Sequence, residues 1–243
     1  MACRLGCGEL KDRLRAAAPA VLPSLLLCDF ANLKREIQRL EEADVAALHL
    51  DVMDGHFVPN LSYGLPIVEA VRRSTDLPLD VHLMIEEPAK YIEQFRDAGA
   101  NTMTVHVEAV EDPRPLLDEI RSLGALAGLA INPPTPLSAI EPSLPHCDIV
   151  LVMSVMPGFG GQPFDRSALE KLRALSARND YDALLEVDGG INTLTVGDCA
   201  EAGAELLVAG SAIFRAGDYR AAVAELRARA LSAAKGKAQV PIQ

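Results

Sequence analysis

Histidine and aspartate, residue types that bind metals and transfer protons, recur at alternate positions in two short hydrophobic segments of this chain. The segments read Leu48-His-Leu-Asp-Val-Met53 and Leu79-Asp-Val-His-Leu-Met84. Because side chains alternate between the two faces of a strand, the histidine and the aspartate of each segment share one face. A third hydrophobic segment ends in Asp188, which puts another carboxylate at the end of a strand.

Two imidazoles and two carboxylates that meet in space would suit a divalent transition metal. Taken alone, a histidine on a strand is better interpreted as an ordinary, partly buried core residue. Three strands that each end in a ligand-type residue favour a metal site, because a buried carboxylate without a partner is costly. The residues that we predict to converge are His49, Asp51, His82 and Asp188.

The other histidines carry weaker signals. His106 shares a strand face with Thr104 and Glu108, and we interpret it as a core residue or an outer support of the site. His56 and His146 are predicted to lie in loops. Three methionines also fall near strand ends, where spacing alone indicates adaptable core side chains. They are Met53, Met84 and Met153.

Glycine-rich turns follow the last three strand-like segments. Any one of them alone is an ordinary turn, but glycine lets a backbone N–H approach a ligand closely. In barrels of alternating strands and helices, the loops after strands seven and eight frequently bind phosphate. The set therefore favours a phosphorylated ligand. The turns are Pro157–Gln162, Gly189-Gly190 and Gly210-Ser211.

Eight β-rich segments alternate with helical patterns, which is typical of parallel strands joined by crossover helices. Eight such units in 243 residues predict a single (β/α)8 TIM barrel, an α/β fold, better than an open sheet. We assign the barrel to residues 20–234, between an N-terminal extension (1–19) and a C-terminal tail (235–243). The strand segments are Ala20–Ser24, Ala46–Asp51, Leu79–Met84, Thr102–Val107, Leu126–Ile131, Ile149–Val155, Leu184–Val187 and Leu206–Ala209.

Residues that favour helix-ending turns support this repeat of helices and strands. Gly99 and Gly203 each stand between two alanines just before a strand, where a helix would end in a left-handed residue. Asp44 stands at the corresponding place before an earlier strand, and aspartate tolerates that conformation better than most residues. The segment 52–65 is a long connection without periodicity, which indicates a functional loop.

Composition excludes several classes of protein. The net charge is −11, with 34 acidic against 23 basic residues, and aromatics are only 4% with no Trp, which argues against a nucleic-acid partner. No apolar run approaches the ~20 residues that span a bilayer, so we expect no membrane partner. The cysteine count is 5 and no CxxC pair occurs, which favours a reduced, cytoplasmic location.

The chain resembles the ribulose-phosphate 3-epimerase family in stretches that follow the family's order over roughly residues 20–219. The stretches 49–60 and 153–162 are long and highly specific. All the resembling stretches are Pro23-Ser24 with Asp29-Phe30-Ala31, His49–Asn60, Leu79–Met84, Met153–Gln162, Glu186–Asn192 and Val208–Phe214.

The resemblance implies a metal-dependent enzyme of the pentose phosphate pathway that interconverts D-ribulose 5-phosphate and D-xylulose 5-phosphate through a metal-stabilised enediolate. It implies that the four converging residues bind the metal, and that Asp51 and Asp188 exchange roles as proton acceptor and donor at C3. The substrate-binding residues that it implies are Ser24, His82, Met53, Met84, Met153, Gly158, Phe159, Gly160, Gly161, Gly189, Gly190, Gly210 and Ser211.

The chain departs from the family pattern at a few positions. Leu27-Cys28 stands where the family often has a small residue, Asp44-Val45 replaces a usual Gly-Ala pair, and Met156 replaces a more polar residue. None of these changes removes a metal ligand or an acid/base residue. They affect a helix–strand turn and the shape of the loop that would cover the site.

Two alternatives remain open from sequence. A related enzyme acting on D-allulose 6-phosphate would need the same chemistry, and a catalytically idle barrel would bind phosphate or metal only. The donor set accepts one divalent ion, whether Zn, Fe(II), Mn or Co. The exposed helices of a barrel leave room for assembly, and we expect a homo-oligomer that acts on a small-molecule sugar phosphate.

Overall fold

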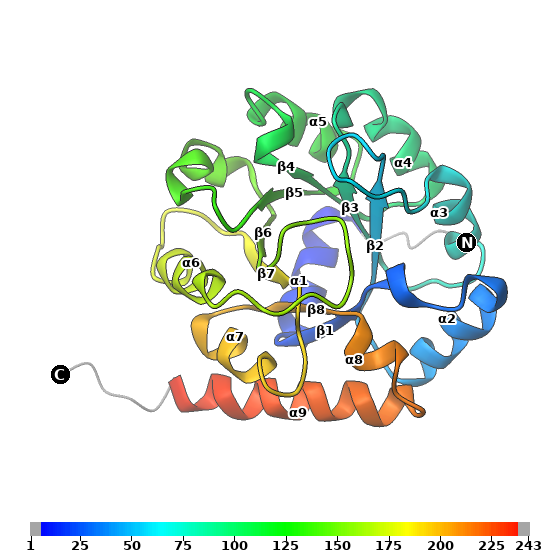
Figure 1. The fold of residues 1–243 in the computed structure, drawn as a ribbon. Coiled ribbons are helices and arrows are strands. Elements are labelled where there is room, and N and C mark those ends of the chain that lie inside the picture. The colour runs from blue at the N-terminus through cyan, green and yellow to red at the C-terminus, as the bar shows by residue number, and fades with distance from the viewer. Residues whose placement is uncertain (1–5, 238–243) are drawn as a thin grey trace.

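The computed structural model describes residues 6–237 and has eight parallel strands that form one barrel (Figure 1). The strands are hydrogen-bonded in the order β1-β8-β7-β6-β5-β4-β3-β2. A parallel bridge between Ser24 and His49 links β1 to β2 and brings the ends of the sheet together. The strands are β1 (Ala20–Pro23), β2 (Leu48–Met53), β3 (Leu79–Met84), β4 (Thr102–His106), β5 (Leu126–Ile131), β6 (Ile149–Met153), β7 (Leu184–Asp188) and β8 (Leu206–Ala209).

Apart from the first helix, the helices lie around the outside of the barrel, as Figure 1 shows. The α-helices are α1 (Cys7–Ala17), α2 (Leu33–Glu42), α3 (Leu65–Arg72), α4 (Ile92–Ala98), α5 (Arg114–Ser122), α6 (Ser167–Ser176), α7 (Val196–Ala202), α8 (Ser211–Phe214) and α9 (Tyr219–Lys237). Short 3-10 helices complete the connections. They are η1 (Leu25–Leu27), η2 (Phe30–Asn32), η3 (Pro88–Lys90), η4 (Val107–Ala109), η5 (Leu137–Ala139) and η6 (Glu141–His146).

The predicted strands are all present, with differences at their ends. The largest concerns β2, which begins at Leu48 instead of Ala46 and continues to Met53. The reason is its partner: β3 begins at Leu79, which pairs with Leu48, so the two preceding alanines have no strand to pair with there. The left-handed turns occur where the sequence predicted them, with φ of 112° at Gly99, 113° at Gly203 and 57° at Asp44.

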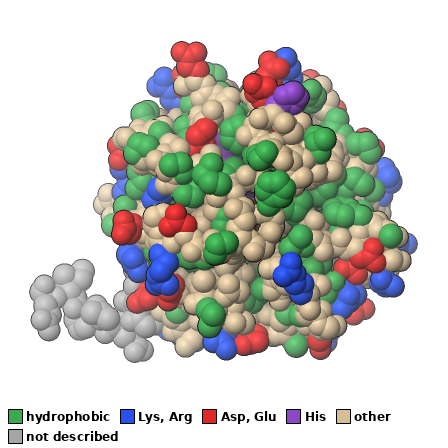
Figure 2. Space-filling view, viewed as in Figure 1, with side chains coloured by type: hydrophobic (Ala, Val, Ile, Leu, Met, Phe, Trp, Pro, Cys, Tyr) green, Lys and Arg blue, Asp and Glu red, His purple; other side chains and the backbone are tan. Residues whose placement is uncertain are grey.

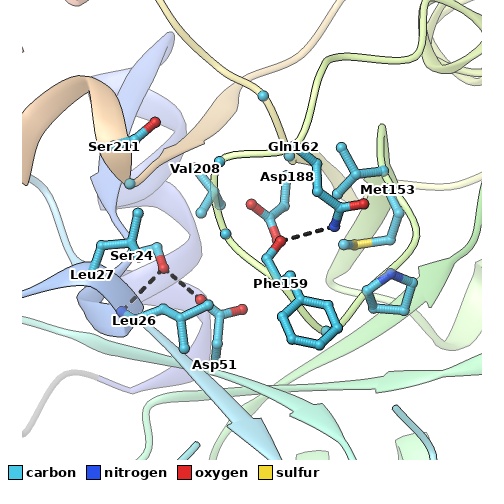
Figure 3. Close-up of a pocket in the computed structure, with 18 of the residues that line it drawn as sticks. Ser24, Leu26, Leu27, Asp51, Met153, Phe159, Gln162, Asp188, Val208 and Ser211 are labelled. Atoms are coloured by element: carbon cyan, nitrogen blue, oxygen red, sulfur yellow. Dashed lines mark hydrogen bonds between the residues drawn. The ribbon is translucent and has the colours of Figure 1, made fainter. Parts of the chain in front are cut away.

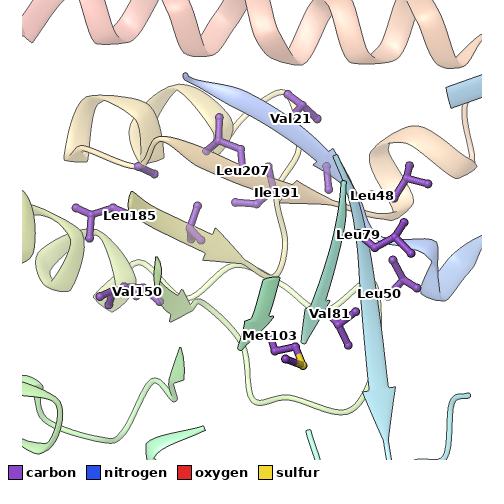
Figure 4. Close-up of a cluster of buried hydrophobic side chains, with 14 of the residues drawn as sticks. Val21, Leu48, Leu50, Leu79, Val81, Met103, Val150, Leu185, Ile191 and Leu207 are labelled. Atoms are coloured by element: carbon purple, nitrogen blue, oxygen red, sulfur yellow. The ribbon is translucent and has the colours of Figure 1, made fainter. Parts of the chain in front are cut away.

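The main hydrophobic core lies between the outer faces of the strands and the ring of helices (Figure 4). Leu48, Leu50 and Val52 face outward into this layer and are almost completely buried. Because alternate residues point the other way, the polar side chains of the same strand face the inside of the barrel. The alternation that buries the apolar side chains of β2 in the outer core therefore also points its polar side chains toward the inside of the barrel.

A second apolar layer fills one end of the barrel interior. Leu10 and Leu14 of α1 pack there against inward-facing residues such as Leu22, Leu126 and Leu206. Figure 1 shows α1 behind the middle of the barrel. This end is formed by the amino ends of the strands, so α1 closes the barrel opposite to the end where the polar residues gather.

Parts of the predicted extension and tail lie outside the described residues, namely 1–5, which include Cys3, and 238–243. Helix α9 continues to Lys237, so the first residues of the predicted tail are helical. The boundaries at 20 and 234 stay a prediction. Every cysteine of the described part is a free thiol. Among the described residues, no helix has the length and apolar character required to cross a membrane.

Candidate active site

The four predicted metal ligands lie together at the carboxyl ends of β2, β3 and β7. Each offers one nitrogen or oxygen atom, and these four atoms all lie within 4.8 Å of one another. Three of the residues are buried and the fourth, Asp188, is partly exposed at the end of its strand. Neighbouring register explains the convergence, because Asp51 pairs with His82 across β2 and β3. The residues are His49, Asp51, His82 and Asp188.

Asp51 is held by contacts from three directions. The hydroxyl of Ser24 donates a hydrogen bond to its Oδ2 at 2.5 Å, and Nδ1 of His82 lies 3.2 Å from its Oδ1. Its backbone N–H donates to the Tyr63 hydroxyl at 2.9 Å. Tyr63 belongs to the long connection after β2, so this loop helps to fix the aspartate. The length and lack of periodicity of this loop predicted a functional role, but not this contact.

His49 presents a free nitrogen to the cluster. Its Nδ1 is 2.6 Å from Oδ2 of Asp80, while its buried Nε2 has no hydrogen-bond partner, although Asp51 Oδ1 lies 3.3 Å away. An unsatisfied buried nitrogen is costly unless a ligand takes its lone pair. Together with two carboxylates and a second imidazole, this orphan atom fits a divalent metal ligand.

A second group of polar side chains lies one layer deeper in the barrel. Asp80 accepts hydrogen bonds from both Thr102 and His49, and Glu186 Oε1 lies 3.6 Å from His49 Nδ1. Both carboxylates are buried. The alternation in the sequence already placed Asp80 on the face of His82, but it assigned the deeper carboxylates no role. A carboxylate behind a metal-binding imidazole fixes its orientation and tautomer.

The two aspartates of the metal cluster have opposite electrostatic surroundings. Burial acts to raise the pKa of Asp51, but the adjacent imidazoles of His49 and His82 outweigh it and lower that pKa. Burial, together with the negative charge of Asp51, raises the pKa of Asp188 to about 7. Burial lowers the pKa of His82 to about 4. Near neutral pH, the metal-free site therefore holds one ionised aspartate and one that readily keeps a proton.

A cavity with an empty volume of about 570 Å³ opens above the cluster. Figure 3 shows Ser24 and Asp51 on one side of it, with Asp188 and Met153 toward the other. Within the described residues, no Lys or Arg lines it. The predicted substrate-binding residues that line it are Ser24, Met53, Met84, Met153, Gly158, Phe159, Gly160, Gly161, Gly189, Gly190, Gly210 and Ser211.

The glycines after β7 leave no room for side chains. Gly189 and Gly190 have φ of 110° and 60°, and a Cβ on Gly190 would lie 2.8 Å from the backbone nitrogen of Phe164. The turn can therefore bring its backbone N–H groups close to a ligand. Because no basic side chain of residues 6–237 lines the cavity wall, backbone amides are the main donors that an anion would meet there.

The segment 157–162 crosses the mouth of the cavity and is tied down at several points. The Asn60 side chain donates to the Gly158 carbonyl at 2.6 Å, and Gln162 Nε2 donates to the carbonyls of Met156 and Phe159 at 2.7 and 2.8 Å. Phe159 is 55% exposed. On the face seen in Figure 2, hydrophobic side chains surround the centre and charged ones lie mainly toward the edge. The contributions of Asn60 and Gln162 were not predicted.

The remaining histidines fall into different places. His106 is fully buried beside His82, with the two Nε2 atoms 2.8 Å apart. His56 is exposed in the loop after β2. His146 was predicted to lie in a loop and instead ends the 3-10 helix η6, where Asp118 lies 2.8 Å from its Nδ1.

The fold and the site define a class of protein: a (β/α)8-barrel enzyme with a metal-type cluster and glycine-rich turns at the carboxyl ends of its strands. The model of the ribulose-phosphate 3 epimerase family matches residues 20–214. The chain belongs to this family.

Curated relatives agree with this assignment. The chain is 49% identical over 211 residues to a ribulose-phosphate 3-epimerase of Bacillus subtilis, covering 85% of this chain and 97% of the relative. It is 49% identical over 212 residues to the Synechocystis protein of the same name, covering 85% and 92%. It is 46% identical over 222 residues to a chloroplastic ribulose-5-phosphate-3-epimerase of Arabidopsis thaliana, covering 89% and 79%.

More distant solved structures share the fold alone. A tryptophan synthase α-subunit from Pyrococcus furiosus matches with a TM-score of 0.62 at 16% identity, covering 90% of this chain and 98% of the other. A 3-hexulose-6-phosphate synthase matches with a TM-score of 0.61 at 18% identity, covering 86% and 99%. Function must therefore be argued from the site.

Proposed function

We propose that this protein is a metal-dependent epimerase that interconverts D-ribulose 5-phosphate and D-xylulose 5-phosphate. One observation carries the proposal: Asp51 and Asp188 stand on different strands, β2 and β7, and flank the floor of one cavity with carboxylate oxygens within 4.8 Å of each other. Inversion at a carbon beside a ketone needs a base on one face and an acid on the other. Binding alone would require neither.

The two aspartates divide the proton transfer between them. In one direction Asp51 removes the C3 proton of the substrate, and Asp188 returns a proton to the opposite face of the enediolate. In the other direction they exchange roles. In the metal-free site the pKa of Asp51 is lowered and that of Asp188 is raised to about 7, so the two carboxylates differ in proton affinity, as an acid/base pair requires.

The residues that would hold the metal are His49, Asp51, His82 and Asp188. Bound there, a divalent cation supplies Lewis acidity that stabilises negative charge on the substrate oxygens by several kcal/mol. Its identity stays open among Zn, Fe(II), Mn and Co, because the donor set suits all of them.

The rest of the cavity positions the substrate. Backbone amides of Gly189, Gly190, Gly210 and Ser211 would bind its phosphate, which lies far from C3. This remote binding fixes the orientation of the sugar. The segment 157–162 would close over it and keep water out, with Phe159 contacting the substrate. Ser24 would contact the sugar near Asp51, and Met53, Met84 and Met153 would line the apolar side. His82, also predicted to contact the substrate, is completely buried and does not line the cavity, so its proposed role is to bind the metal.

The names of the curated relatives do not favour the alternatives of a hexulose phosphate substrate or an idle barrel. The homo-oligomer and the cytoplasmic location remain predictions. Three exposed hydrophobic side chains, Phe30, Leu61 and Tyr91, are compatible with an assembly. Light scattering of the purified protein would determine its mass.

The direct test is turnover of D-ribulose 5-phosphate to D-xylulose 5-phosphate by the purified protein, before and after chelation and with metal added back. We expect turnover that chelation abolishes and a divalent metal restores. Reaction in deuterium oxide should put deuterium at C3 of substrate and product. Turnover without any solvent deuterium would contradict the proton-transfer mechanism, and turnover of D-allulose 6-phosphate alone would change the substrate.

A further inference from the structure

A chain of buried polar groups runs from His82 away from the cavity, through β4. His82 Nε2 lies 2.8 Å from His106 Nε2, and His106 Nδ1 lies 3.2 Å from Oε2 of Glu108. The two imidazole rings are stacked with centroids 4.9 Å apart, and both are completely buried. Neither His106 nor Glu108 lines the cavity, so neither can contact the substrate directly.

The position of one hydrogen atom sets the direction of this hydrogen-bond network. Two ring nitrogens 2.8 Å apart need one hydrogen between them, so one donates and the other accepts. Which nitrogen carries it follows from the hydrogen bonds in the rest of the network. The carboxylate at the far end sets that direction.

Glu108 can act only as an acceptor. Burial acts to raise the pKa of Glu108. Hydrogen bonds from the side chains of His106 and Thr135 and from the backbone N–H of Asn132 outweigh burial and lower this pKa to about 2. An ionised carboxylate accepts hydrogen bonds and donates none. His106 must therefore carry its hydrogen on Nδ1, and in a neutral ring its Nε2 is then an acceptor toward His82.

The hydrogen position on His106 affects His82, which is one of the predicted metal ligands. With His106 accepting, His82 carries its hydrogen on Nε2, and the lone pair of its Nδ1 is left free. That Nδ1 is the atom 3.2 Å from Oδ1 of Asp51, on the side of the cluster. Without a cation the ionised Asp51 also accepts a hydrogen from Nδ1, so this tautomer is expected in the metal-bound protein. We propose that Glu108 and His106 are positioning residues that hold His82 in the tautomer that binds the divalent cation through Nδ1. This inference rests on the proposed metal site.

Glu108 is itself anchored by the connection after β5. Its Oε1 accepts a hydrogen bond from the backbone N–H of Asn132 at 2.9 Å. The ammonium of Lys171 donates to three carbonyls of the same connection, those of Asn132, Pro133 and Thr135, at 2.7 to 2.9 Å. The Phe57 ring also packs on His106, with centroids 4.8 Å apart. The carboxylate is thus held at both oxygens, as a fixed reference for the two imidazoles should be.

The first test uses the wild-type protein loaded with Zn(II) and labelled with ¹⁵N in its histidines. Long-range ¹H–¹⁵N correlation spectra distinguish ring nitrogens that carry hydrogen from those that do not. We expect hydrogen on Nε2 of His82 and on Nδ1 of His106, with the His106 signals identified by their loss in His106→Gln. Hydrogen on Nε2 of His106 would overturn the inference, because His106 would then be the donor to His82. Because the spectrum is taken on wild-type protein, the result does not depend on the folding of a variant.

The second test measures metal affinity. Glu108→Gln keeps the shape of the side chain but loses its charge, and we expect Co(II) affinity, measured by competition with a chelator, to fall by about 10- to 100-fold. Glu111→Gln is the matched control, because Glu111 is exposed and only three residues away. Equal affinity in Glu108→Gln and wild type would overturn the inference while leaving the proposed function intact. Wild-type protein that neither binds Co(II) nor turns over substrate would instead refute the proposed function.

Discussion

At the scale of single residues, Asp51 and Asp188 have the same side chain but different proposed roles, because their surroundings differ. Asp51 accepts a hydrogen bond from Ser24 and lies beside two imidazoles that lower its pKa, whereas burial and the charge of Asp51 raise the pKa of Asp188. Carboxylates whose pKa values are pushed apart in this way form the acid and base of many enzymes.

Asp188→Asn should separate the two proton transfers. Removal of one acid/base residue is expected to lower kcat by ~10² to 10⁴. Because Asp51 remains, the variant should still exchange the C3 proton of one epimer with solvent, whereas the other epimer should not exchange. Deuterium incorporation followed by NMR, with each epimer as the starting substrate, measures this. Equal exchange from both epimers would argue against one aspartate on each face.

The same cluster predicts how the metal-free protein responds to pH. Burial, aided by the charge of Asp80, raises the pKa of Glu186 from 4.5 to about 8, and that of Asp188 rises from 3.8 to about 7. A group with a raised folded pKa contributes stability that is present below its unfolded pKa and is lost as pH rises through the folded value. The Tm of chelated protein should therefore fall between about pH 5 and pH 8.

Glu186→Gln is the variant that checks this assignment, since a neutral amide removes one of the two titrating groups. Its metal-free Tm should decline less steeply over the same pH range, as measured by thermal unfolding followed by circular dichroism. A decline as steep as that of wild type would show that Glu186 does not hold a proton in the folded state.

At the scale of elements, two properties of the strands position the site: side chains alternate between the two faces of each strand, and neighbouring strands pack closely together. Gly128 on β5 faces Thr104 on β4, and a Cβ at Gly128 would lie 2.8 Å from the Thr104 Cβ and 3.0 Å from its Cα. The two strands pair directly at this point. The lack of a side chain at Gly128 therefore lets β4 keep the Thr104 side chain inside the barrel, two residues before His106.

Gly128→Ala and Gly197→Ala make a matched pair. The first overpacks the barrel interior and should lower the free energy of unfolding by about 1–3 kcal/mol, occasionally more. The second lies in α7, where a Cβ would meet only Ala233 at 3.6 Å and the Arg229 carbonyl at 3.9 Å, and it should stabilise by about 0.5–1 kcal/mol. Chemical denaturation of both variants measures the difference. Destabilisation of similar size in both would show that crowding at Thr104 is not the cause.

At the scale of the whole molecule, the two ends of the barrel have separate tasks. The carboxyl ends of the strands carry the cluster, the cavity and the glycine turns. The amino ends carry an apolar plug that α1 completes with Leu10 and Leu14. This division is general in such barrels, where one face supplies chemistry and the other stability.

Leu14→Ala tests the division. Leu14 is 1% exposed, so its truncation should lower the free energy of unfolding by about 2–5 kcal/mol. The plug lies at the opposite end from Asp51 and Asp188, so kcat/KM of the folded variant should stay within twofold of wild type. Denaturation and steady-state kinetics on the same sample measure both quantities. A large loss of kcat/KM in folded protein would mean that α1 also shapes the active site.

Much of the fold was readable from sequence, because it depends on local patterns. Alternating strand and helix segments predicted the barrel, and Gly99, Gly203 and Asp44 marked left-handed turns that the structure has. The period of two along β2 and β3 predicted which polar side chains share a face. These signals survive folding because backbone geometry, not tertiary packing, imposes them.

Other features required the tertiary structure. Strand pairing set the start of β2, which the sequence placed two residues too early. The hydroxyl of Tyr63 on Asp51, the tie from Asn60 to Gly158, and the chain from His82 to Glu108 join residues that no local period relates. The sequence determined which side chains enter the barrel, because alternation is a property of each strand by itself. Only the closed barrel decided which of them touch, because contact depends on how different strands and loops are placed against one another.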